Sequence, residues 1–204
     1  PIVIAAAKTQ DQTACTPALG GGIIGITSVS PLAAGDYTYV WYYNPTLGAA
    51  FGALGQVDLT ATLPLAATAT TISNLAEGTY YVVATRDAGT PLGANCPSDP
   101  FRVDIFDNSV DPTFTLTPTV DTSCVGSTDP EGGIAVTITT AGANFSIDIN
   151  DSGAADVEDF NNVAAGTYNT TVLLAPDVYT VVLTDNTTGC STTMTTEVTK
   201  NEQP

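Results

Sequence analysis

Histidine is absent from the 204 residues, and basic side chains are scarce, because 4 Lys+Arg stand against 21 Asp+Glu. Without histidine the chain lacks the commonest general base near neutral pH and the commonest transition-metal ligand. The formal net charge of -17 disfavours binding to a nucleic-acid backbone or to an anionic membrane surface. Cations are the charged partners that this composition favours.

Long hydrophobic runs are also missing, since none reaches the roughly 18 residues that a membrane-spanning helix needs. We therefore expect no direct membrane insertion. The hydrophobic content of 43% is that of a folded, globular chain. The first eight residues lack the layout of a signal peptide. Because the chain begins and ends inside what looks like a repeat boundary, we expect it to be a segment of a longer protein.

A pattern occurs twice along the chain: a cysteine, a Gly-Gly pair, an alternating strand, a Leu-Ala-x-x-x-Tyr segment and a closing cysteine. The two copies run from Cys15 through 75–80 to Cys96, and from Cys124 through 174–179 to Cys190. A tandem copy predicts two stackable modules. We place the first repeat at 1–111, with an insertion at 45–71, and the second at 112–204.

Alternation with period two dominates both repeats, and helical periodicity is nearly absent. This pattern predicts an all-β chain of two tandem immunoglobulin-like antiparallel β-sandwiches, each of about seven strands. Tyr42 points away from the predicted core and is a candidate ligand contact. The residues expected to face the core are Tyr37, Tyr39, Trp41 and Tyr43 in the first repeat, and Ile134, Val136, Ile138, Phe145, Ile147 and Ile149 in the second.

Four cysteines at matching places indicate disulfides formed in an oxidising compartment. Three pairings are open from sequence alone. We favour pairing within each repeat, Cys15 with Cys96 and Cys124 with Cys190. Four free thiols in a cytosolic protein are the alternative.

One acidic segment resembles a calcium-binding loop. Oxygen donors fall at its positions 1, 3, 5, 9 and 12, with a glycine at position 6, a spacing that lets short side chains converge on one hard cation. A solvated acidic hairpin is the alternative. The predicted ligands are Asp148, Asn150, Ser152, Asp156 and Asp159.

A second acidic cluster, Asp104, Asp107 and Asp111, lies at the predicted joint between the repeats. Calcium bound there would cancel the repulsion between the carboxylates. Solvated linker acids are the alternative interpretation.

The order Cys, Gly-Gly, alternating strand, Trp41, Leu-x-x-Gly-Thr-Tyr80 and closing Cys96 resembles the SprB-type repeats of gliding-motility and cell-surface adhesins of Bacteroidota. The stretch 179–190 is similar to the ending of that repeat. The resemblance implies export by the type IX route, display on the extracellular cell surface as a filament or stalk, and contact with surfaces or polysaccharides.

The predicted function is therefore that of a two-repeat segment of an exported bacterial adhesin, which mediates attachment or gliding by extended multivalent display. A structural spacer or polymerising filament subunit, whose partners are neighbouring repeats, is the alternative. A glycan-active enzyme domain is a more remote alternative, since the sequence contains no activated nucleophile, phosphate-binding loop or cofactor fingerprint. We expect no catalytic residues and no nucleic-acid partner, with calcium as the one candidate cofactor.

Overall fold

The computed structural model describes residues 1–63, 65–88, 95–124 and 129–201. The chain divides into two compact units, Pro1–Ser109 and Val110–Pro204. The predicted boundary between 111 and 112 lies two residues further along the chain. Position 64 of the predicted insertion and positions 202–204 of the predicted second repeat lie outside the described residues.

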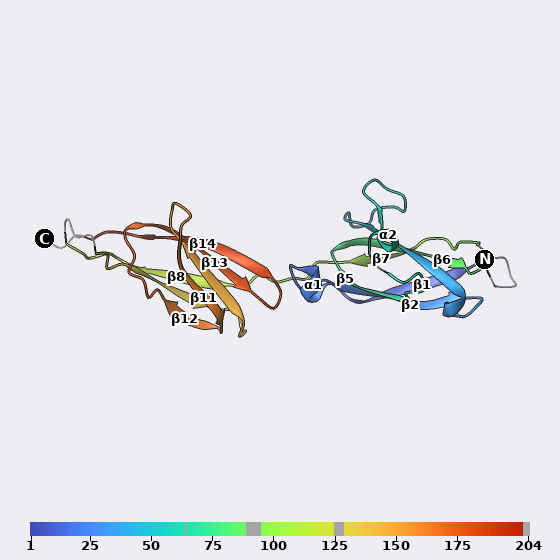
Figure 1. The fold of residues 1–204 in the computed structure, drawn as a ribbon, viewed down its shortest axis with the longest axis horizontal. Helices are drawn as coiled ribbons and strands as arrows, with labels where there is room; N and C mark the ends of the chain where they lie inside the picture. The colour runs from blue at the N-terminus through green and yellow to red at the C-terminus, as the bar shows by residue number, and fades with distance from the viewer. Residues whose placement is uncertain (64, 89–94, 125–128, 202–204) are drawn as a thin grey trace. The chain divides into compact units, whose positions relative to one another are not determined.

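Two antiparallel sheets build the first unit, one with the strand order β1-β2-β5 and the other with β4-β3-β6-β7 (Figure 1). Three short helical turns, α1 (Pro17–Gly20), η1 (Ala34–Asp36) and α2 (Leu59–Thr62), lie in the connections. The strands are β1 (Val3–Gln10), β2 (Gly22–Ser30), β3 (Tyr37–Asn44), β4 (Val57–Asp58), β5 (Thr71–Leu75), β6 (Gly78–Arg86) and β7 (Phe101–Ile105).

The second unit repeats this topology strand for strand, with sheets β8-β9-β12 and β11-β10-β13-β14. Its strands are β8 (Phe114–Thr119), β9 (Gly133–Ile138), β10 (Phe145–Asn150), β11 (Asp156–Val163), β12 (Gly166–Asn169), β13 (Asp177–Asp185) and β14 (Cys190–Val198). The predicted fold class, two tandem all-β sandwiches, is confirmed. Within the described residues, no helix is long and apolar enough to cross a membrane.

Alternate residues of β3 form the centre of the first core, as predicted. Tyr37, Tyr39 and Trp41 are at most 1% exposed. The indole Nε1 of Trp41 donates a hydrogen bond of 3.2 Å to the carbonyl of Ala69, which satisfies its only polar atom. Tyr43 is partly buried against the same core.

The second core has the same construction with aliphatic side chains. Each fully buried Val, Ile, Leu or Phe side chain contributes about 2 kcal/mol relative to an exposed one. The predicted core residues are all buried: Ile134, Val136 and Ile138 on β9, and Phe145, Ile147 and Ile149 on β10.

A tyrosine hydroxyl ties β6 or β13 to the segment that precedes it. In the first unit the hydroxyl of Tyr80 donates to the carbonyl of Ala76 at 2.7 Å, and in the second Tyr179 donates to Ala175 at 2.9 Å. This arrangement is the tyrosine corner of β-sandwich domains. Burial raises the pKa of both tyrosines, so each hydroxyl keeps the proton that it donates.

A third tyrosine makes the same contact in a more exposed setting. The hydroxyl of Tyr168 donates to the carbonyl of Ala164 at 2.9 Å, four residues earlier, and the ring is only half-buried. The same tyrosine-to-carbonyl hydrogen bond is therefore part-buried at Tyr80 and Tyr179 but exposed to water at Tyr168.

The predicted cysteine pairing is wrong. Cys15 and Cys190 are disulfide-bonded, whereas Cys96 and Cys124 are exposed free thiols. Disulfide-bonded cysteines are enough to indicate folding in an oxidising compartment. What fails is the assumption that the first and last cysteine of a repeat lie near each other.

In the first unit the reason is the length of β1. Cys15 follows the end of β1, and its Sγ lies 3.5 Å from the Oγ of Ser109. Cys96 lies at the start of β1, where it borders a hollow with Pro1 and Ile2. Eight extended residues span roughly 26 Å, whereas a disulfide requires Cα atoms within about 7 Å.

The same separation occurs in the second unit. Cys190 opens β14, and Cys124 follows Ser123, whose hydroxyl accepts a hydrogen bond of 3.3 Å from Lys200 beyond the other end of that strand. A nine-residue strand again holds the two sulfur atoms too far apart for a bond.

We expect Tyr80→Phe and Tyr179→Phe each to lower the free energy of unfolding by about 1 kcal/mol, because each removes a part-buried hydrogen bond made by a buried tyrosine. Tyr168→Phe is the matched control and should cost less, since water can replace the hydroxyl at this half-buried site. Denaturant unfolding of the whole chain measures all three. Equal losses in the three variants would contradict the role given to burial.

A maleimide reagent applied to the folded, unreduced protein should label Cys96 and Cys124 and leave Cys15 and Cys190 unmodified, because only a free thiol reacts. Peptide mass mapping identifies the labelled positions, and reduction under denaturing conditions should then expose all four. Label on Cys15 before reduction, or protection of Cys96, would contradict the bonded and free states assigned to these cysteines.

Candidate functional site

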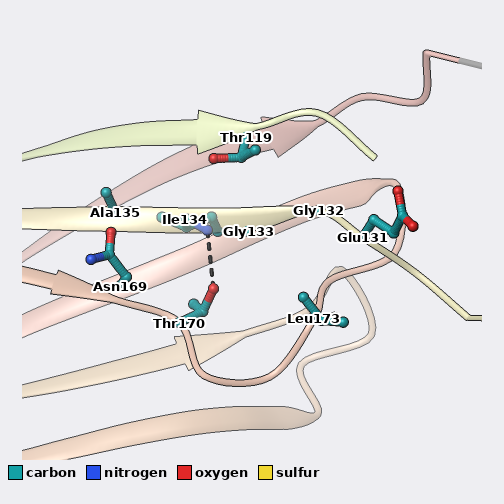
Figure 2. Close-up of a pocket in the computed structure, with 9 residues that line it drawn as sticks. All are labelled: Thr119, Glu131, Gly132, Gly133, Ile134, Ala135, Asn169, Thr170 and Leu173. Carbon is teal, nitrogen blue, oxygen red and sulfur yellow. Dashed lines mark hydrogen bonds between the residues drawn. The ribbon is translucent and has the colours of Figure 1, made fainter. Parts of the chain in front are cut away.

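A pocket of about 200 Å³ opens at one end of the sheet β8-β9-β12 in the second unit (Figure 2). The start of β9 forms its floor, where two glycines contribute no side chains. Thr119 borders it on the β8 side, and Asn169 borders it on the β12 side. The lining residues are Thr119, Glu131, Gly132, Gly133, Ile134, Ala135, Asn169, Thr170 and Leu173.

Sequence reasoning missed this pocket. The sequence pattern aligns Gly133 with Gly22, and only the strand pairing, Gly22 with Leu75 and Gly132 with Leu174, makes Ile23 its counterpart. A side chain that is present in one repeat and absent from the other marks a place where the surfaces differ.

The insertion predicted at 45–71 contains β4 and α2, and its first part packs on the outer face of the sheet β4-β3-β6-β7 (Figure 1, cyan). The ring of Phe51 meets Tyr42 and Tyr81 edge to face, with centroids 5.2 and 5.3 Å apart. The hydroxyl of Tyr81 donates to the carbonyl of Ala49 at 2.6 Å. The insertion is therefore anchored to the sandwich.

Tyr42, the predicted ligand contact, is half-buried under Phe51 and so is not presented openly. The large exposed side chains between positions 47 and 57 of the insertion are instead apolar, and Leu54 at its tip is 102% exposed. Exposed apolar groups gathered on one loop are typical of an interaction surface. These exposed residues, called the apolar tip below, are Leu47, Phe51, Leu54 and Val57.

The structure brings together three of the five predicted calcium ligands. Asp148 and Asp159 are cross-strand partners on β10 and β11, and oxygen atoms of these two residues and Asp156 lie within 4.8 Å of one another. The hydroxyl of Ser152 instead donates to Asp177 at 2.9 Å, and the amide of Asn150 donates to Asp148 at 2.7 Å.

The three carboxylates repel one another. Lost solvation raises the pKa of Asp159, and the charges of Asp156 and Asp148 raise it further. Three oxygen ligands on an exposed hairpin could hold a hard cation such as calcium, with water completing its coordination. Calcium binding stays a prediction, but its candidate ligands now lie on the neighbouring strands β10 and β11 rather than along one loop.

The residues of the predicted joint cluster come from both units, and those of the first unit have partners of their own. Asp104 is paired with Arg102 and accepts a hydrogen bond of 2.8 Å from Thr79. The bonds from Arg102 lower the pKa of Asp104. Asp107 accepts from the backbone N–H of Ser109 at 2.8 Å, and Asp111 belongs to the other unit.

The sequence matches no protein-family model and no curated protein sequence. Among solved structures, it is similar to the interferon gamma receptor alpha chain of chicken, with 11% sequence identity over 98% of each chain and a TM-score of 0.33. So low a TM-score transfers nothing about function.

We expect Asp159→Asn to stabilise the second unit slightly at pH 7, by about 0.5 kcal/mol at low ionic strength. Because folding raises the pKa of this acid, its charged form opposes folding above that pKa, and the opposition disappears as the pH falls through it. Thermal unfolding at low and high salt measures the effect.

The control is Asp99→Asn, which removes one exposed negative charge from the first unit. An equal gain in stability in Asp99→Asn, or a gain in Asp159→Asn that persists at high salt, would contradict local repulsion as the cause. In the same assay we expect calcium to raise the midpoint of the wild type more than that of Asp159→Asn.

Proposed function

We propose that the chain is a two-repeat segment of an exported bacterial cell-surface adhesin of the SprB type, which contributes to attachment or gliding by multivalent display. The observation that carries the proposal is the exact repetition of one seven-strand topology, tyrosine corner included, while the surface differs between the two units. A repeated scaffold with varied loops is the usual construction of a recognition protein.

The chemistry of the chain supports an extracellular location. Disulfide-bonded Cys15 and Cys190 fit an oxidising environment, and the net charge of -17 fits a protein kept apart from anionic lipid. The type IX export route and the gliding role come from the resemblance of the repeats to SprB-type sequences.

The apolar tip is the part of the first unit best suited to touch a surface. It is held by Phe51 and Ala49 on a rigid sheet, so contact by Leu54 costs little ordering. Weak contacts of this kind become strong when many repeats act together.

The alternative functions are less well supported. A pure spacer gives no reason for an anchored loop with a fully exposed leucine. A glycan-active enzyme of the usual kind needs two carboxylates on either side of the bond to be cleaved, whereas Asp148, Asp156 and Asp159 share one exposed hairpin.

The double variant Leu47→Ser, Leu54→Ser should reduce attachment of the multivalently displayed chain to polysaccharide-coated and bare surfaces several-fold, because apolar contact area is lost. Leu54 is fully exposed and Leu47 is 38% exposed, so stability should fall by no more than about 1 kcal/mol. Surface plasmon resonance measures attachment.

Val178→Ser is the matched control, since Val178 is also an exposed apolar residue but lies in the second unit. Attachment that is equally strong in the double variant would remove the apolar tip from the proposal. No attachment of the wild type to any surface would favour the spacer.

A further inference from the structure

The pocket of the second unit exists because the chain leaves the sheet where β12 ends. The backbone N–H of Thr170 still donates to Ile134, at 3.0 Å, and Leu174 rejoins Gly132 through two bonds of 2.8 and 3.1 Å. Residues 171–173 form an arch between these two attachments. The arch stands beside the start of β9, so an open space remains between them.

Gly133 is what keeps this space open. A Cβ atom there would lie 3.3 Å from the Oγ of Thr170, at the edge of the pocket. Gly132 has a different role, because its Cβ would lie 2.5 Å from the carbonyl oxygen of Leu174 and so could not be accommodated. Gly132 is thus needed for the backbone to approach Leu174, whereas Gly133 leaves the space of the pocket open.

The first unit has the same attachments but lacks both features. Gly22 pairs with Leu75 and Ile24 with Ile72, so only two residues form the arch there, against three in the second unit. Ile23, half-buried, takes the position of Gly133. The pocket is therefore a specialisation of the second repeat and not a property of the fold.

The groups around the pocket are suited to an uncharged polyol. Among the described residues, the amide of Asn169 and the hydroxyl of Thr119 have no hydrogen-bond partner, and each can both donate and accept. One carboxylate oxygen of Glu131 accepts a hydrogen bond of 2.6 Å from the hydroxyl of Thr122, and the other oxygen can accept a hydrogen bond from a ligand. Leu173, 60% exposed, offers an apolar wall.

We propose that this pocket binds one uncharged sugar residue of a surface polysaccharide. A volume of about 200 Å³ is below that of pockets that enclose drug-sized ligands, so it suits a single ring. Hydroxyls on opposite sides of the ring would meet Asn169 and Glu131, which lie at the two ends of the pocket, and the C–H face would meet Leu173 (Figure 2). Glu131 and the net charge of -17 select against acidic sugars.

This inference rests on the proposed function and names a ligand class for it. The test is amide chemical-shift mapping of the whole chain with methyl glycosides of glucose, galactose and mannose, with N-acetylglucosamine, and with N-acetylneuraminic acid as the acidic probe. We expect at least one neutral sugar to shift Gly133, Ile134 and Thr170 at millimolar concentration. Equal shifts with N-acetylneuraminic acid would overturn the selectivity for uncharged sugars.

Gly133→Ile copies the first unit and should abolish these shifts, because the side chain fills the pocket. Thr119→Val should weaken binding about tenfold, while Thr115→Val, the same change on the same face of β8, should not alter it. Absence of pocket shifts with every sugar, or shifts that survive Gly133→Ile, would overturn the inference. Attachment through the apolar tip would then persist, so the two proposals can fail separately.

Discussion

The hydrogen bond of a buried tyrosine is the interaction on which the arrangement of each unit depends. Tyr80 and Tyr179 are almost fully buried, so each hydroxyl needs an internal partner, and the carbonyl four residues earlier provides it. The bond sets how the chain passes from one sheet to the other. It also fixes Leu75 and Leu174 opposite Gly22 and Gly132, and so fixes where each arch must end.

The features that distinguish the two units lie outside this common frame. In the first unit, the insertion extends the sheet through β4 and rests on Tyr42 and Tyr81. In the second, a longer arch and Gly133 leave a pocket. Neither change replaces a residue of the alternating core, although Leu59 and Leu65 of the insertion pack against the first core. The repeats can therefore differ in surface chemistry while keeping one topology.

Charge acts on this frame mainly as a local constraint. Lys8, Arg102 and Lys200 are paired with carboxylates, in the pairs Lys8–Asp11, Arg102–Asp104 and Lys200–Asp121. Four cations cannot neutralise 21 acids, and among the described residues no ion pair links Asp148, Asp156 or Asp159 to a basic side chain. Such sites pay a small electrostatic cost and favour cations or protons, which is consistent with the raised pKa of Asp159.

The sequence by itself determined the strands, the cores and the two-unit division, because period-two alternation and a tandem repeat are local properties of the chain. Only the tertiary structure decided which distant groups meet. Cys15 and Cys96 lie at opposite ends of β1, and Asp148 reaches Asp159 through strand register rather than loop spacing. The pocket depends on one extra arch residue beside Gly133, a difference of path that has no signature in composition or periodicity.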